Sequence, residues 1–385
     1  MDIVFGVIIG LIVITILVVI HELGHALVAR RNGVVVEEFG IGFPPKVWAK
    51  KIKHSILGKN VRLSINALPL GGFVKLQGEH DTDDGPGDYG SATLWQKTKI
   101  LLAGVAMNWI AAVVLFSILA SIGMPRLFEN QFSIAADTQI VRKPVEIVTV
   151  VGGSPAEKAG LQQGDKILRF AGAPLEGAED LTRLALENKG KTIETIYSRN
   201  DVEHSTKVTL RANNSDKRGY LGATSAQQEL IKASWSAPIV GVGTTVQMTW
   251  ETFKALGGML YKGITGLALQ FSPNETTREA AQRDLQVVGD SVAGPVGIFG
   301  IIFPAAGKAG GAHVLMLSAI ISLTLAVMNM LPIPALDGGR WAVTMLFRLL
   351  KKPLKPELEE RIHGTGFMLL MVLIVLITIS DIGKL

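Results

Sequence analysis

Four long apolar runs dominate the pattern of hydrophobic and polar positions along the chain. They cover residues 3–27, 100–124, 314–331 and 367–379, and the last run reaches full length if the helix also includes residues 362–366. A helix of roughly 20 apolar residues crosses the hydrocarbon core of a bilayer. The pattern therefore predicts a polytopic α-helical membrane protein with about four transmembrane helices.

Between these runs the pattern changes to short alternating stretches. Residues 34–76 alternate apolar and polar positions and are rich in Gly and Pro, which favours β-hairpins. Within them "LPLGGFV", residues 68–74, is unusually apolar for a solvent loop, and we expect it to dip into the membrane where the protein buries it. From residue 145 onward, short strands and turns surround a polar helix near 178–188, which predicts a small α+β domain.

Three other stretches are less regular. Residues 229–270 have apolar side chains at helical spacing but many polar and Gly positions. We expect amphipathic helices on the outer membrane surface or against the helix bundle, and favour these over a fifth span. Residues 273–290 are polar and predict a loop, and residues 79–92 predict an acidic, flexible loop.

These patterns divide the chain into eight predicted segments. They are a first transmembrane helix at 1–29, a cytosolic and membrane-associated β-hairpin region at 30–98, a second transmembrane helix at 99–124, an extracytoplasmic α+β domain at 125–226, extracytoplasmic amphipathic helices and a loop at 227–311, a third transmembrane helix at 312–339, a cytosolic basic loop at 340–361 and a fourth transmembrane helix at 362–382.

Composition supports a membrane protein and narrows its chemistry. Hydrophobic residues make up 48% of the chain and charged residues 18%, a balance too apolar for an ordinary soluble domain. The net charge of +5 is not gathered into a basic arm with interleaved aromatic residues, so nucleic acid is not an expected partner. The chain has no cysteine, so any metal must be held by histidine and carboxylate side chains.

Loop charges orient the predicted helices. Eleven Lys or Arg residues lie between Arg30 and Lys99, and six lie between Arg340 and Arg361. Cytosolic loops of membrane proteins are enriched in these residues. Both segments are therefore expected in the cytosol, which leaves the N- and C-termini outside.

The sequence "HELGH", residues 21–25, ends the first apolar run. On a helix, His21 and His25 are four residues apart and share one face, so both imidazoles can reach one zinc ion. Glu22 lies next to His21 and can take a proton from a metal-activated water without binding the metal. Ionisable side chains at the end of an apolar span are costly, which favours a functional role over a polar helix end.

A third ligand is expected near the end of the third run. Asp337 is the only carboxylate in "NMLPIPALDGGR", residues 329–340, where Pro and Gly break the helix beside a cavity. A catalytic zinc usually has three protein ligands and one open position. The alternative is that "LDGG" is a plain turn that closes the span.

Together these motifs resemble the site-2 protease family of intramembrane zinc metalloproteases, and within it the bacterial RseP-like branch with a single PDZ domain. HExxH in the first run and "NxxPxPxLDGG" after the third stand in the family's order. "AGVAMN" (103–108) is similar to a second family motif, which usually has Pro where this chain has Val105, and "GPVGIFG" (294–300) is similar to another family segment. The resemblance implies that zinc is bound by His21, His25 and Asp337 and that Glu22 is the general base.

The resemblance also implies how substrate is held. Asn329 would bind substrate or stabilise the oxyanion, as an amide donor can. The hairpin at 66–76 would pair with an unwound substrate segment by strand addition, with simple packing of the hairpin as the alternative. The expected substrate-binding residues are Asn66, Leu68, Gly71, Gly72, Phe73 and Asn108.

The α+β domain at 125–226 resembles a PDZ domain through "GSPAEKAGLQQGDKILRFAG", residues 153–172. Residues 219–223, "GYLGA", are either its carboxylate-binding strand or merely a closing strand. The domain would bind peptide C-termini or act as a filter that rejects substrates with large outer domains.

The expected function is that of a zinc endopeptidase in a bacterial inner or plasma membrane, with the active site towards the cytosol. It would hydrolyse peptide bonds in transmembrane segments of single-span proteins, such as anti-sigma factors or signal-peptide remnants, in regulated intramembrane proteolysis. The other expected partner is membrane lipid. The alternative is a PDZ-bearing membrane scaffold or chaperone with a structural or vestigial metal site; a structural zinc would fill all four coordination positions.

Overall fold

The computed structural model describes residues 2–128, 130–215 and 218–383. Contacts divide the chain into two compact units. The residues up to Leu119 and those from Ala237 onward form one unit, called here the helical unit. Ala120–Ser236 forms the other, called the β-rich unit, which contains the predicted α+β domain.

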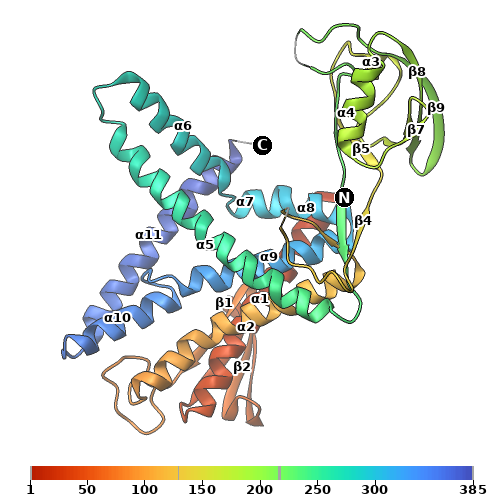
Figure 1. Cartoon of the computed structure of the whole chain (residues 1–385). Coiled ribbons are helices and arrows are strands. Elements are labelled where there is room, and N and C mark those ends of the chain that lie inside the picture. The colour runs from red at the N-terminus through yellow and green to blue at the C-terminus, as the bar shows by residue number, and fades with distance from the viewer. Residues whose placement is uncertain (1, 129, 216–217, 384–385) are drawn as a thin grey trace. The chain divides into compact units, whose positions relative to one another are not determined.

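The helical unit contains two long strands and most of the helices of the chain (Figure 1). Its elements are α1 (Asp2–Arg31), β1 (Val36–Ser55), β2 (Gly58–Leu76), α2 (Leu94–Ile122), α5 (Ala237–Leu269), α6 (Glu275–Ser291), α7 (Pro295–Gly297), a π-helical turn η1 (Ile298–Ile302), α8 (Phe303–Ala309), α9 (Gly311–Met330), α10 (Asp337–Leu349) and α11 (Pro356–Ile382).

Four helices of the described chain, α1, α2, α9 and α11, are each long and apolar enough to cross a membrane. They coincide with the four predicted runs, so the prediction of a polytopic helical membrane protein is confirmed. Two of them begin earlier than predicted: α2 starts at Leu94 and α11 at Pro356. The added turns carry charged residues such as Lys97 and Glu359, which a hydropathy pattern excludes from a span.

Small residues bring the membrane helices into close contact. A Cβ atom added at Gly24 of α1 would lie 2.5 Å from the carbonyl oxygen of Ala103 in α2. One added at Gly10 would lie 2.6 Å from the ring of Phe303 in α8. Helices in a membrane associate largely through such close backbone approach, because lipid is as apolar as their side chains. α1 is therefore packed against α8 near its start and against α2 near its end.

The two long strands fold back beside α1. Residues 38–41 of β1 pair on both sides, with residues 62–65 and with residues 72–75 of β2, and Val36 pairs with Leu76. Residues 46–55 pair with residues 58–66. Residues 72–76 consequently form an edge of the sheet. The hydroxyl of Thr15 donates a hydrogen bond of 2.7 Å to the carbonyl of Pro69. The apolar stretch before the edge strand thus lies beside the middle of a helix that can cross a membrane.

The segment from 237 to 309 is almost entirely helical. α5, with 33 residues, and α6 pack together as a helical hairpin (Figure 1). The prediction of a loop at 273–290 is wrong, because α6 covers Glu275–Ser291. Its start is capped by Asn274, and Leu285 packs on Gly266 of α5. A polar helix of this kind depends on its neighbour, which a hydropathy pattern does not reveal.

Two further differences concern the ends of predicted segments. α6 and residues Pro295–Ala309 meet at a bend of 50°, and together they are long and apolar enough to form a broken span. The predicted basic loop at 340–361 is largely helical, because α10 runs to Leu349 and α11 begins at Pro356. Arg340, Arg348 and Arg361 lie on these helices, while Lys351, Lys352 and Lys355 lie in the short connection between them. A charge count alone does not distinguish the two positions.

The β-rich unit is built mainly of short strands. Its elements are β3 (Met124–Pro125), β4 (Gln139–Arg142), β5 (Val145–Val150), α3 (Pro155–Lys158), β6 (Lys166–Phe170), β7 (Ala173–Pro174), α4 (Ala178–Glu187), β8 (Thr192–Arg199), β9 (Val202–Thr209), β10 (Ala223–Ala226) and β11 (Glu229–Lys232).

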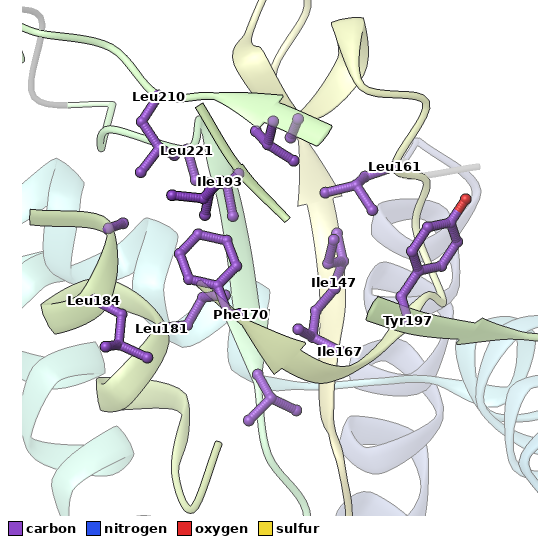
Figure 2. Packing of buried hydrophobic residues seen from close by; sticks show 14 residues of the cluster. Ile147, Leu161, Ile167, Phe170, Leu181, Leu184, Ile193, Tyr197, Leu210 and Leu221 are labelled. Carbon is purple, nitrogen blue, oxygen red and sulfur yellow. The ribbon is translucent and has the colours of Figure 1, made fainter. Parts of the chain in front are cut away.

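One antiparallel sheet and α4 form a compact α+β domain within this unit, called the PDZ-like domain after the resemblance noted in its sequence. The strand order is β10-β5-β6-β8-β9, and β7 pairs with β6. Phe170 is fully buried and lies among Ile193, Leu181 and Ile167 in the core of the domain (Figure 2). Ile167 of "GDKIL" and Leu181, Leu184 and Ala185 of α4 belong to this core, so the predicted α+β fold is confirmed.

A second, three-stranded sheet of order β3-β11-β4 adjoins the PDZ-like domain in sequence. The loop before β4 contains Asp137, which accepts hydrogen bonds from the hydroxyl and amide groups of Ser234 and Ser236. These hydrogen bonds lower the pKa of the Asp137 carboxyl to about 2. The ionised carboxylate therefore ties this loop to the residues just after β11.

Candidate metal centre and active site

Three side chains from two helices converge inside the helical unit. His21 and His25 lie on one face of α1, and Asp337 is the first residue of α10. Asp337 Oδ2 lies 2.9 Å from His21 Nε2 and 3.3 Å from His25 Nε2, and the two Nε2 atoms are 3.1 Å apart. The two predicted histidines and the predicted carboxylate are thus brought together, although 312 positions separate His25 from Asp337.

The cluster fits a metal ion better than it fits hydrogen bonding within itself. His25 Nδ1 lies 2.7 Å from the carbonyl oxygen of Ile100, which accepts its proton and leaves the Nε2 lone pair facing the cluster. Asp337 Oδ2 is buried and has no hydrogen-bond partner among the described residues. Four ligands at roughly 2.0–2.1 Å from a tetrahedral zinc are about 3.3 Å apart, close to the spacing of these atoms. A bound cation would hold such lone pairs together.

Helix α2 forms the wall behind the histidines. A Cβ atom added at Gly104 would lie 2.5 Å from His25 Nε2 and 2.7 Å from His21 Nε2. Only glycine leaves room for the two imidazoles at this position. This close approach explains the Gly in "AGVAMN", and Val105 beside it leaves α2 an unbroken helix from Leu94 to Ile122.

The break between α9 and α10 brings Asp337 to the histidines. α9 ends at Met330 and α10 begins at Asp337, with residues 331–336 as an irregular connection. A Cβ atom added at Gly338 would lie 2.3 Å from the carbonyl oxygen of Met330, and one at Gly339 would lie 1.9 Å from that of Ile333. The two glycines of "LDGG" therefore let α10 start directly against this connection, so the motif is more than a turn that closes a span.

Glu22 is held by the edge strand of the hairpin sheet. Its Oε2 accepts a hydrogen bond of 3.1 Å from the backbone N–H of Val74. A Cβ added at the neighbouring Gly72 would lie 3.8 Å from Glu22 Cγ and 2.9 Å from the carbonyl oxygen of Gly40. The general-base candidate thus lies between the histidines of α1 and the edge of β2. This contact could not be predicted from the sequence, because every residue except proline has a backbone N–H.

The predicted substrate-binding residues fall into two groups. Leu68, Gly71, Gly72 and Phe73 lie on or just before the edge strand, and Leu68 is exposed. Asn66 is buried and donates to the carbonyl oxygens of Ile41 and Gly42, so its amide is used inside the hairpin.

The two remaining asparagines lie on membrane helices. Asn108 is fully buried on α2, and its side-chain amide lies 3.4 Å from His21 Nδ1. Asn329 is partly exposed in the last turn of α9, and its side-chain amide forms no hydrogen bond to a described residue.

A cluster of polar side chains beside Asp337 was not predicted from the sequence. Lys97 is buried and forms an ion pair with Asp81, while Arg340 lies 3.6 Å from Glu359. Arg340 and Glu359, with Glu79, His80 and Asp337 among others, line a cavity of about 330 Å³. The acidic segment 79–92 is therefore anchored and not merely a solvated loop. The only feature of its sequence that indicated this anchoring was its charge, and solvated loops are charged as well.

Comparisons with known proteins agree with this geometry. The model of Peptidase family M50 matches residues 9–373. A putative zinc metalloprotease of Clostridium perfringens is 31% identical, and one of Clostridium acetobutylicum is 32% identical; the matches cover 98% of this chain in both cases, and 98% and 97% of the relatives. The regulator of sigma-W protease of Bacillus subtilis is 26% identical, over 96% of each chain.

Among solved structures, the PDZ domain of an SdrC-like protein from Listeria monocytogenes matches 24% of this chain and 93% of its own length. That match has 20% identity and a TM-score of 0.20. The family model spans both the HELGH helix and Asp337, and the relatives match almost end to end. The chain therefore belongs to peptidase family M50 and is a zinc metalloprotease.

Proposed function

We propose that this multi-pass membrane protein hydrolyses peptide bonds within the transmembrane segments of single-span membrane proteins. The convergence of His21, His25 and Asp337 within a bundle of membrane-length helices carries the proposal. A hydrolytic site among membrane helices would reach peptide bonds of transmembrane segments, which a soluble protease cannot approach because lipid and helical hydrogen bonding shield them.

In this proposal each polar group of the site has one task. His21, His25 and Asp337 would hold zinc, which supplies a Lewis acid that activates water and polarises a carbonyl group. Glu22 takes the proton of the attacking water as the hydroxyl joins the carbonyl carbon. It then passes that proton to the leaving nitrogen as the C–N bond breaks. The Val74 N–H holds the Glu22 carboxylate on the side of α1 that faces the edge strand.

The edge strand supports strand addition as the mode of substrate binding. Backbone groups alternate along a strand, so the N–H and C=O of Gly72 lie on the same edge as the N–H of Val74. An unwound transmembrane segment has unpaired backbone groups that need partners in an apolar setting, and the N–H and C=O of Gly72 would supply them. Leu68, Gly71 and Phe73 would then contact substrate side chains, and the unpaired amide of Asn329 would bind the substrate or the oxyanion.

The PDZ-like domain would add selection outside the membrane. β10 is the last strand of its sheet, beyond β5, and so offers an edge to an extended peptide. Residues 219–223 lead into this strand, as a carboxylate-binding turn would. Peptide C-termini left by an earlier cleavage are therefore the proposed ligands, and rejection of large outer domains is the alternative role.

The substrates we propose are anti-sigma factors or signal-peptide remnants. The printed name of the Bacillus subtilis relative refers to regulation of a sigma factor, which supports the first class. The matched relatives are bacterial, and the Lys and Arg residues of segments 30–99 and 340–361 support a cytosolic location for both. The site would then face the cytosolic half of a bacterial plasma or inner membrane.

Replacement of Glu22 by Gln tests this function. The variant should retain zinc and lose cleavage of a co-expressed single-span substrate, because an amide cannot take the water's proton. Glu203→Gln, on an exposed strand of the β-rich unit, is the matched control and should cleave normally. Undiminished cleavage by Glu22→Gln would rule out the mechanism. The scaffold alternative predicts no cleavage even by the unaltered protein.

A further inference from the structure

The wall of α2 that faces the histidines has a regular construction. Ile100, Gly104 and Asn108 are each four residues apart and so lie on one face of the helix. Ile100 faces His25, Asn108 faces His21, and Gly104 lies against both rings. Each imidazole thus meets its own polar partner on α2, one turn above or below the glycine.

A neutral histidine that binds metal through Nε2 carries its proton on Nδ1 and needs an acceptor there. For His25 that acceptor is the backbone carbonyl oxygen of Ile100 at 2.7 Å. For His21 the group in the matching place is the side-chain amide of Asn108, whose nitrogen lies 3.4 Å from His21 Nδ1. Both histidines therefore need a hydrogen-bond acceptor at Nδ1. A backbone carbonyl lies in that place beside His25, and a side-chain amide lies there beside His21.

Asn108 itself has an unused acceptor. Its side chain is fully buried, and Oδ1 has no hydrogen-bond partner within the described chain. A half-turn of the amide about χ2 exchanges Oδ1 and Nδ2 without moving the rest of the side chain. In that orientation Oδ1 accepts the Nδ1 proton of His21, which satisfies a buried donor and a buried acceptor at once.

The backbone of Asn108 is fixed separately from its side chain. The hydroxyl of Ser322 in α9 donates a hydrogen bond of 2.8 Å to the carbonyl oxygen of Asn108. α2 and α9 are therefore tied together at this residue. The side-chain amide is left to interact with His21 alone among the described side chains.

We propose that Asn108 is a positioning residue for the metal centre and not a substrate contact. It holds the His21 ring in the tautomer and orientation that direct the Nε2 lone pair towards His25 and Asp337. Complete burial behind His21 removes Asn108 from the surface that a substrate could touch. The inference rests on the metal site proposed above and adds the residue that prepares one of its ligands.

The test is the zinc affinity of the purified full-length protein in detergent, measured by competition with a chelator. Asn108→Leu keeps the approximate volume and removes the acceptor, and should weaken zinc binding by about 10- to 100-fold, as loss of an outer-shell partner does. Asn108→Asp keeps an acceptor oxygen and should bind zinc at least as tightly as the unaltered protein. Thr244→Val removes another fully buried polar group of the helical unit and should leave the affinity unchanged.

The outcomes separate this inference from the proposed function. If the unaltered protein binds zinc and cleaves substrate while Asn108→Leu binds zinc equally well, the positioning role is refuted and the protease is not. If Asn108→Leu does not fold, Asn108→Asp decides, because zinc binding weakened about tenfold or more in a folded Asp variant also refutes the role. An unaltered protein that binds no zinc overturns both the inference and the metal site on which it rests.

Discussion

The substitution Gly104→Ala probes the packing of α2 against the two histidines. The added methyl carbon would lie 2.5 Å from His25 Nε2, 2.6 Å from His21 Cε1 and 2.7 Å from His21 Nε2. Ordinary contacts of a Cβ atom begin near 3.4 Å, so the rings or α2 must shift by roughly 0.7–0.9 Å. The ligand atoms are only 2.9–3.3 Å apart, so a shift of that size removes them from a common coordination sphere.

A displacement of about 1 Å at a reacting group typically costs on the order of 100-fold in function. We therefore expect Gly104→Ala to lower zinc affinity by about 100-fold, which corresponds to about 3 kcal/mol. The same change favours the helix itself by up to about 1 kcal/mol, because alanine is the better helix former. The protein should consequently remain folded while it loses metal.

Chelator competition on the purified full-length protein measures the affinity, and thermal unfolding of the metal-free form checks the fold. Gly257→Ala in α5 is the matched control, because no heavy atom lies within 4 Å of a Cβ added there. It should bind zinc normally. A zinc affinity of Gly104→Ala within about threefold of the control would refute the close packing described for this site.

Three further expectations follow from contacts outside the ligand set. Val74→Pro removes the N–H that holds Glu22 and should lower kcat by about 10- to 100-fold with zinc content unchanged, as loss of a hydrogen bond to a charged group does. Steady-state kinetics together with metal analysis checks this, and an unchanged kcat would exclude a role for the contact. The Asp137 carboxyl has a pKa of about 2 in the folded protein, below its ordinary value of 3.8, so the stability it contributes is complete above about pH 5 and is lost as pH falls through 2. The difference in Tm between the unaltered protein and Asp137→Asn should shrink over that range, and a difference that grows would contradict this sign. The chain has no cysteine, so a single introduced cysteine reports on its own location. With the proposed topology, Lys191→Cys should react with a membrane-impermeant thiol reagent in intact cells, and Lys51→Cys should react only after permeabilisation. The reverse pattern would invert the topology.

Side chains whose role depends on spacing could be predicted from the sequence. His21 and His25 share a face because they are four positions apart on a helix, and Asp337 stood out as a lone carboxylate between helix breakers. Hydropathy located the four membrane helices for a similar reason, since length and apolarity are local properties.

Features that depend on backbone groups or on a neighbouring element could not be predicted in this way. The N–H of Val74 and the carbonyl oxygen of Ile100 hold Glu22 and His25, yet every residue has such groups. α6 was predicted to be a loop because its stability comes from packing on α5, which lies outside its own pattern. Asn108 was identified as important through its motif, but its position behind His21 became visible only when α1 and α2 were seen side by side.

Mapping the cleaved bond is the most direct test of proteolysis inside the membrane by this protein. Full-length protein loaded with zinc and a single-span substrate would be reconstituted together in liposomes, and the products sequenced by mass spectrometry. We expect the unaltered protein to cut within the transmembrane segment and Glu22→Gln, with zinc still bound, to make no cut. A cut confined to a flanking soluble segment, or the same products from both proteins, would contradict this expectation.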